Sequence, residues 1–194
     1  MLGAGVWLAA LIVGFATLQR YASAAGGAHA PVKGVAEVFA PYRNEGRALA
    51  VMAIHPRCPC TEASLSELGD FLARAGAGCD ALIVHVVPPG ADWPAAKTRD
   101  LGARNVPVVA DQNGQLATQL GAETSGHLVL FDAAGQVRFH GGITRSRGHR
   151  GKAPAQDAML SVLSAPGSAA EVQSAPVYGC ALIGSCSPSH VAAP

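Results

Sequence analysis

A run of small and branched apolar residues, Ala48–Ile54, stops abruptly at Pro56. The run has the length of a strand that is buried on both faces of a sheet. From Thr61 onward, apolar residues recur at helical spacing, with charged and hydroxyl residues between them. The sequence therefore predicts a buried strand that leads through a short turn into an amphipathic helix.

Two cysteines, Cys58 and Cys60, lie in this turn on either side of Pro59. A thiol at the N-terminus of a helix faces backbone N–H groups that lack partners and the positive end of the helix dipole. Both effects lower the pKa of a thiol and favour the reactive thiolate. The turn is therefore the main functional signal in the sequence. We expect a depressed pKa for Cys60, because it is nearer the start of the helix.

A second buried strand, 81–87, follows the helix, and two such strands joined by a helix form a parallel βαβ unit. The remaining predicted elements alternate between helix and strand and include a hairpin: helices over 94–102, 115–120 and 156–163, and strands over 106–110, His127–Phe131 and 136–140. This order predicts an α/β fold, with a mixed sheet of about five strands and helices on both faces.

Residues 2–18 contain no charged residue and are apolar except for glycines and Thr17. Their length lies between that of a signal-peptide core and that of a minimal membrane span. Either interpretation exports the domain, anchored at the periplasmic face of the cytoplasmic membrane or released into the periplasm. The expected division is a signal peptide or membrane anchor over 1–21, a linker into the domain over 22–46, the domain over 47–163 and a cysteine-containing tail over 164–194.

The formal net charge is only +1, and no stretch combines basic residues with interleaved aromatic residues. Nucleic-acid-binding surfaces are strongly basic. We therefore expect no nucleic-acid partner for this chain.

Three stretches resemble the thioredoxin-like superfamily, in its exported thiol-disulfide oxidoreductase and peroxiredoxin-like branch: Cys58-Pro59-Cys60, VPVVADQNGQLATQLGA and HLVLFDAAGQVRFHGG. The resemblance covers about residues 47–163. The stretches HPRCPCTEASL and GGITRSRGH also look like thioredoxin-like proteins of the RedB type. The resemblance implies a three-layer α/β/α fold with a mixed central sheet after the N-terminal apolar helix. It also implies a redox-active site that needs no cofactor and acts on protein thiols or disulfides.

The chain departs from the superfamily's pattern at two places. Thioredoxins have two residues between their cysteines, whereas this chain has one, so either thiol could be the one that attacks. Gly126 stands where the superfamily has a cis-proline that packs against the disulfide. We assign candidate catalytic roles to Cys58, Cys60 and His55, and candidate substrate-binding roles to Arg57, Gly126 and His127.

Two other activities are compatible with the same turn. Soft thiolate ligands favour copper, so Cys58, Cys60 and His55 could instead form a copper-binding or copper-delivery site. His127, His140 and His149 are then candidate distal ligands. The stretch from Cys60 to Ala63 also resembles single-chain peroxiredoxins, which would make Cys60 a peroxidatic thiol. In those enzymes a Thr or Ser occupies the position of Arg57.

The other three cysteines have different expected roles. Cys79 follows the predicted helix and is expected to be a small buried hydrophobic residue that reacts slowly. Cys180 and Cys186 could pair with each other in the tail. Alternatively, the apolar segment 177–183 folds back so that Cys180 resolves a disulfide at Cys58 or Cys60. The Gly-rich basic loop over 141–152 is either a solvated loop or holds a substrate anion near the cysteines.

Overall fold

The computed structural model describes residues 2–94, 98–102, 104–164 and 171–183. The strands in these residues are β1 (Ala48–Ile54), β2 (Cys79–Val87), β3 (Thr98–Asp100), β4 (Asn105–Gln112), β5 (His127–Phe131), β6 (Val137–Gly142) and β7 (Gln173–Ala175). The helices are α1 (Leu2–Ser23), α2 (Val35–Phe39), α3 (Thr61–Ala75), α4 (Gln115–Gln119) and α5 (Pro154–Ser164), with 3-10 turns over Ala40–Tyr42 and Gly76–Gly78.

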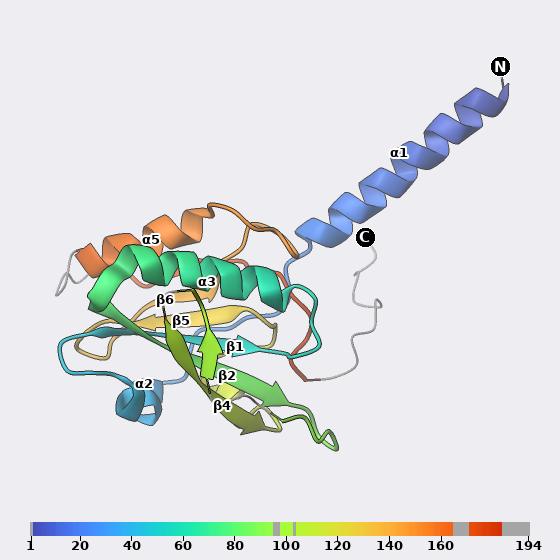
Figure 1. Ribbon diagram of the computed structural model, residues 1–194. Coiled ribbons are helices and arrows are strands. Elements are labelled where there is room, and N and C mark those ends of the chain that lie inside the picture. The colour runs from blue at the N-terminus through green and yellow to red at the C-terminus, as the bar shows by residue number, and fades with distance from the viewer. Residues whose placement is uncertain (1, 95–97, 103, 165–170, 184–194) are drawn as a thin grey trace.

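The described strands form one seven-stranded mixed sheet in the order β3-β4-β2-β1-β5-β6-β7 (Figure 1). Central strand β1 pairs in parallel with β2 and antiparallel with β5. All seven residues of β1 are buried, as the continuous apolar run predicts. The βαβ unit and the hairpin expected from the sequence are both present.

Helices cover both faces of the sheet. Side chains on one face of β1, such as Met52, pack in a core with Phe71 of α3 and Met159 of α5. Side chains on the other face, such as Val51, pack in a second core with Phe39 of α2. The alternation along one strand therefore supplies two cores. The fold is the three-layer α/β/α arrangement with a mixed central sheet that the sequence predicts.

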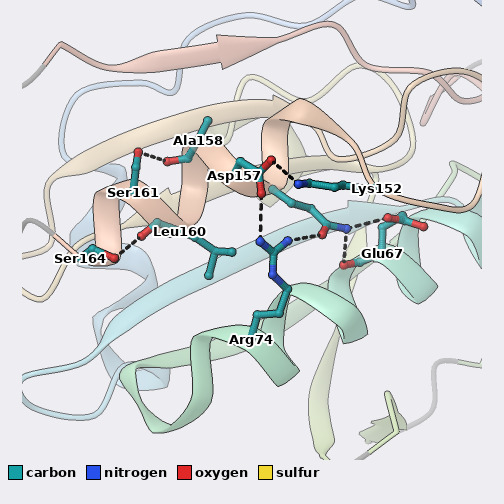
Figure 2. A network of polar contacts seen from close by, with 9 residues as sticks. Glu67, Arg74, Lys152, Asp157, Ala158, Leu160, Ser161 and Ser164 are labelled. Atoms are coloured by element: carbon teal, nitrogen blue, oxygen red, sulfur yellow. Dashed lines mark hydrogen bonds and ion pairs between the residues drawn. The ribbon is translucent and has the colours of Figure 1, made fainter.

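A polar network fixes α5 and the loop before it onto α3 (Figure 2). The carboxylate of Glu67, only 1% exposed, accepts hydrogen bonds from the Gln156 side chain at 2.6 Å and the Gly151 backbone N–H at 2.5 Å. Near the C-terminal end of α3, the Arg74 guanidinium pairs with Asp157 at 2.9 Å. Because a buried carboxylate needs such donors, the network sets the position of the basic loop 141–152 relative to α3.

Helix α1 projects away from the domain (Figure 1). Its residues Gly3–Ser23 have a mean hydropathy of 1.3. By length and composition, this helix is long and apolar enough to cross a membrane. The residues that follow pack onto the domain. The backbone N–H of Gly26 donates to the carbonyl of Val177, and that of His29 to the carbonyl of Gly121, both at 2.8 Å. The segment expected to be a linker is therefore partly attached to the domain.

Two regions differ from the sequence-based expectation. Instead of a helix over 94–102, the described part of that segment contains β3, which pairs antiparallel with β4. Residues 95–97 lie outside the described residues. The open edge of β4 offers backbone N–H and C=O groups with which this segment pairs. A sequence pattern within the segment does not reveal such partners. The tail also contributes β7, which pairs in parallel with β6, so it is packed over a longer stretch than expected.

Candidate active site

The turn between β1 and α3 places both cysteines at the start of the helix. Cys60 is the N-cap residue of α3, and its carbonyl accepts a hydrogen bond from the Ser64 N–H at 3.2 Å. The Cys58 carbonyl accepts one from the Thr61 N–H at 3.0 Å, and the Cys58 N–H donates to the His55 carbonyl at 3.1 Å. Both cysteines are buried, with 3% of Cys58 and 9% of Cys60 exposed. Their expected position at the helix N-terminus is thus found.

A buried hydroxyl network holds this turn against the loop before β5. The His55 N–H donates to Ser125 Oγ at 2.9 Å, and Thr61 Oγ1 donates to the His55 carbonyl at 2.9 Å. The two hydroxyls of Thr61 and Ser125 also lie 2.9 Å apart. These hydrogen bonds hold His55, which precedes the two cysteines, and Thr61, which follows them. They therefore fix the backbone of the turn before and after the cysteines. The motif contains Thr61, but the part played by Ser125 could not be read from the sequence.

Gly126 lies in the loop before β5, next to the first turn of α3. Its N–H donates to the Ala53 carbonyl at 2.8 Å. Its φ is +91°, a conformation that favours glycine, and a Cβ at this position would lie 2.6 Å from Ser64 Oγ. The loop therefore approaches the first turn of α3 more closely than a larger residue would permit.

The C-terminal segment 177–183 runs alongside this loop. Ala181 and Thr124 form an antiparallel bridge. The Ser125 N–H donates to the Cys180 carbonyl, and the Leu182 N–H to the Glu123 carbonyl, both at 2.8 Å. On the other side of the segment, the Cys180 N–H donates to Cys58 Sγ at 3.3 Å. The structure therefore brings Cys180 to Cys58, whereas Cys186 lies outside the described residues.

The sulfur of Cys58 is stabilised as a thiolate. Burial raises the pKa of Cys58, but hydrogen bonds from the thiol and the backbone of Cys180, the backbone of Cys60 and the hydroxyl of Thr61 outweigh burial and lower it. Donors that converge on a sulfur favour its charged form. Of the two cysteines, Cys58 is therefore the one whose thiolate form the surroundings favour.

The expectation that Cys60 has a depressed pKa is wrong. Burial raises the pKa of Cys60, and the neighbouring Cys58 raises it further through charge repulsion and a shared hydrogen bond. The charge of Arg147 and the backbone N–H of Gly148 offset part of this rise. The effect of the helix start on the pKa of Cys60 is thus outweighed by burial and by the neighbouring Cys58.

His55, Arg57 and Trp93 form one contact group beside the cysteines. His55 Nδ1 accepts a hydrogen bond from the Arg57 N–H at 3.2 Å, and the His55 ring meets the Trp93 ring edge-on at 5.2 Å. The Arg57 guanidinium lies 4.4 Å from the centre of the Trp93 ring. Burial and the charge of Arg57 lower the pKa of His55, so the imidazole is neutral at neutral pH. Sequence reasoning missed Trp93, whose only signal is its place after a Pro- and Gly-rich stretch.

The basic loop contacts the C-terminal segment beside the site through Arg147. The Arg147 side chain donates to the Gly179 carbonyl and lies 5.0 Å from the centre of the Tyr21 ring of α1. The Arg147 backbone N–H donates to the Ala22 carbonyl at 2.9 Å. Arg147 therefore connects the end of α1 to the C-terminal segment next to Cys60. No anion-binding role follows from these contacts alone.

His127 is inaccessible to a substrate in this structure. It is 0% exposed in β5, its ring lies 6.1 Å from that of His140, and neither ring nitrogen has a hydrogen-bond partner. Burial, with smaller contributions from His140 and His29, lowers the pKa of His127 to about 4. The assignment of His127 to substrate binding is therefore not supported by its position.

The copper alternative requires ligands that converge on one point. In the described part of the chain, no group of three or more His, Cys, Asp or Glu side chains is arranged to hold a metal ion. Cys58, Cys60 and His55 therefore do not form a metal-ligand set in this structure. Cys79 is fully buried, and burial raises the pKa of its thiol to about 12.

Comparisons with protein-family models and with curated protein sequences find no match. Solved structures do match. An uncharacterised conserved protein from Geobacillus kaustophilus has a TM-score of 0.53 and 17% identity, over 74% of this chain and 79% of that chain. A hypothetical protein from Sinorhizobium meliloti 1021 has a TM-score of 0.52 and 20% identity, over 83% of this chain and 91% of that chain. These two share the fold with this chain.

Thioredoxin-like proteins are present among the structures of lower similarity. One is the exposed lipoprotein thioredoxin of Streptococcus pneumoniae, with a TM-score of 0.42 and 22% identity, over 65% of this chain and 88% of that chain.

Proposed function

We propose that the protein is a thiol-disulfide oxidoreductase in which Cys58 is the attacking thiol. The supporting observation is the set of donors that converge on Cys58 Sγ at the start of α3, including the Cys180 N–H at 3.3 Å. The thiolate is the nucleophile of thiol-disulfide exchange, so the sulfur that is best stabilised as an anion attacks first.

The exchange takes place in two displacements. The Cys58 thiolate attacks one sulfur of a partner disulfide, the partner's S–S bond breaks, and the other partner sulfur leaves as a thiolate that takes up a proton. A second thiol of the chain, Cys60 or Cys180, then loses its proton and attacks Cys58 Sγ. This step releases the second partner sulfur, which is protonated in turn. The partner disulfide is reduced to two thiols, and two cysteines of the chain are oxidised to a disulfide.

The residues around the thiols have positioning and contact roles. His55 accepts the hydrogen bond of Arg57 and, through its backbone, holds the turn to Ser125. Arg57 is exposed, and its guanidinium lies over Trp93, so this pair offers a partner polypeptide a cation and an aromatic surface beside Cys58. Gly126 keeps the loop before β5 close to α3.

The exposed apolar helix α1 supports an exported location for this activity. We place the domain at the periplasmic face of the cytoplasmic membrane, or free in the periplasm if α1 is removed as a signal peptide. Its partners are protein thiols or disulfides of that compartment, where disulfides persist. The resemblance of the stretches 55–65 and 141–149 to RedB-type proteins supports our assignment of the chain to that type.

The other two activities have less support. A copper site lacks a converging set of ligands among the described residues. A peroxidase centred on Cys60 would need a thiolate at the cysteine whose pKa is raised. The copper alternative rests on the softness of thiolate ligands, and the peroxidase alternative rests on the sequence resemblance.

The reduction of insulin by dithiothreitol, followed by turbidity, tests the proposed function. The wild-type protein should accelerate the reaction, and Cys58→Ser should lose at least about tenfold of this acceleration because the nucleophile is removed. Cys79→Ala is the matched control, since Cys79 is a buried thiol outside the site, and it should keep the wild-type rate. If Cys58→Ser keeps the wild-type rate, the proposal is wrong.

A further inference from the structure

The C-terminal segment 177–183 is held on both sides of Cys180. On one side of Cys180, Val177 is 1% exposed and its carbonyl accepts a hydrogen bond from Gly26. On the other side, Leu182 is also 1% exposed and its N–H donates to Glu123. Since both anchors are buried, the segment packs on the domain at the site, and this packing sets where Cys180 lies.

Gly179 explains how the backbone of the segment reaches the site. A Cβ at this position would lie 2.1 Å from the carbonyl oxygen of Ser125, closer than any real Cβ contact. The Gly179 carbonyl is also held by the Arg147 guanidinium. The segment therefore packs directly against the loop that carries Ser125, and this approach needs a glycine next to Cys180.

The Cys180 backbone bonds in two opposite directions. Its carbonyl accepts the Ser125 N–H at 2.8 Å, and its N–H donates to Cys58 Sγ at 3.3 Å. The Cys180 thiol also makes a hydrogen bond to Cys58 that favours the Cys58 thiolate. A thiol in this position can reach the Cys58 sulfur without a large movement of either backbone.

We propose that Cys180 is the resolving thiol of the site and that the segment 177–183 delivers it to Cys58. This inference deepens the proposed function and rests on it. It also assigns different roles to the three thiols: Cys58 attacks, Cys180 resolves, and Cys60 stays reduced during the exchange.

Cys60 is a poorer resolving thiol for two reasons. A disulfide between Cys58 and Cys60 would close a small ring across a single residue, and such a ring strains the disulfide geometry. Burial also raises the pKa of the Cys60 thiol, and this cause remains when Cys58 is bonded to the partner sulfur. Cys180 avoids the ring strain because it lies 122 positions away from Cys58 in the chain.

The resolving step balances as follows. After Cys58 attacks the partner disulfide, Cys58 Sγ is bonded to one partner sulfur. Cys180 Sγ loses its proton and attacks Cys58 Sγ, the bond to the partner breaks, and the partner sulfur leaves as a thiolate that is protonated. A Cys58–Cys180 disulfide has formed, and the oxidant is the partner disulfide, which has taken up two electrons and two protons.

The same segment also covers the nucleophile. Only 3% of Cys58 is exposed, and the backbone N–H of Cys180 in the segment 177–183 donates a hydrogen bond to its sulfur. A partner disulfide therefore reaches Cys58 when the segment moves aside, and the return of the segment brings Cys180 to the mixed disulfide. The packing of the segment 177–183 on the domain therefore both covers Cys58 and places Cys180 beside it.

The experiment traps the mixed disulfide with oxidised glutathione, followed by acid quenching and peptide mapping under non-reducing conditions. In Cys180→Ser, glutathione bound at Cys58 should accumulate at least about tenfold above the wild-type level, because attack continues without resolution. The backbone N–H of residue 180 is retained in this variant. Cys60→Ser should resolve like the wild type, and oxidised wild-type protein should yield a Cys58–Cys180 peptide pair.

Cys186→Ser is the control for the tail and should behave like the wild type. Cys180→Ala is a second variant, and thermal unfolding checks that both Cys180 variants fold. A Cys58–Cys60 peptide pair in the wild type, with accumulation in Cys60→Ser instead of Cys180→Ser, overturns the resolving role and leaves the proposed function intact. A Cys180–Cys186 pair with normal resolution in Cys180→Ser does the same. If glutathione binds at Cys58 in none of the variants, both proposals fail.

Discussion

The backbone N–H of Cys180 donates a hydrogen bond to Cys58 Sγ although 122 positions separate the two residues. The carbonyl of the same residue accepts a bond from Ser125, so Cys180 connects the loop before β5 to the turn before α3. The most distant part of the described chain is therefore an integral part of the candidate active site. The reactivity of Cys58 should depend on this segment as well as on the helix.

The first prediction concerns which thiol ionises first. The pKa of Cys58 is lowered and that of Cys60 is raised, so Cys58 should react with iodoacetamide at a lower pH than Cys60. Alkylation of the wild-type protein at a series of pH values, with peptide mapping to follow each cysteine separately, gives the two midpoints. Cys79, with a pKa of about 12, should stay unreactive across the same range. A lower midpoint for Cys60 would show that the helix start, and not the tail, controls the site.

The second prediction uses the close approach of Gly179 to Ser125. Gly179→Ala places a Cβ 2.1 Å from a backbone oxygen, so the segment must shift and its bond to Cys58 should weaken. The pKa of Cys58 should then rise, and the thiol should be more accessible to a bulky maleimide. Gly78→Ala is the matched control, because a Cβ there has nothing within 4 Å. Equal Cys58 pKa values in both variants would mean that the segment does not tune the thiol.

The third prediction concerns acid stability. Burial lowers the pKa of His127 to about 4, so the unfolded state binds the proton more tightly than the folded state. Above the pKa of an unfolded histidine, about 6.5, His127 is neutral in both states and does not destabilise the folded protein. As the pH falls from there towards about 4, the unfolded state takes up the proton first, and the folded state loses stability relative to it. The change amounts to roughly 3 kcal/mol in the free energy of unfolding, at about 1.4 kcal/mol per pKa unit. His127→Leu should remove this part of the acid sensitivity.

Urea unfolding of the wild type and His127→Leu at pH 7 and at pH 4.5 measures the effect. The wild type should lose more stability than the variant between the two pH values, since Leu has no proton to bind. Other titrating groups are common to both proteins and cancel in the comparison. An equal loss in the two proteins would show that His127 is protonated without cost in the folded state.

The fourth prediction concerns Arg147, which contacts the carbonyl of Gly179 and lowers the pKa of Cys60 through its charge. Arg147→Gln should therefore raise the pKa of Cys60 further and speed hydrogen exchange at the backbone N–H of Leu182. Arg145→Gln is the control, because Arg145 is exposed in the same loop. The two alkylation profiles and the exchange rates should differ only for Arg147→Gln. Identical results would assign Arg147 a surface role.

The sequence predicts the centre of the fold well because that information is local. The apolar run of β1, the helical spacing of α3 and the turn of the hairpin each lie within a few residues, and each forms the expected element. The position of the cysteines at the helix start follows from the same patterns.

The rest of the site depends on contacts that the sequence pattern does not contain. Strands β3 and β7 exist because sheet edges accept them, and their own residues carry little strand pattern. The order of the thiol pKa values is reversed because Cys180 and Thr61 donate to Cys58, and Cys180 lies in the distant tail. His127 is buried by the packing of β5 beside β6, which its place next to Gly126 does not reveal.

The most direct test of the central claim is the rate at which the reduced protein reacts with oxidised glutathione at pH 7, compared between Cys58→Ser and Cys60→Ser. If Cys58 is the attacking thiol, Cys58→Ser should react at least about tenfold more slowly than the wild type, while Cys60→Ser should stay close to the wild-type rate. A loss of the same size in Cys60→Ser, with Cys58→Ser unchanged, would contradict the assignment of Cys58 as the nucleophile.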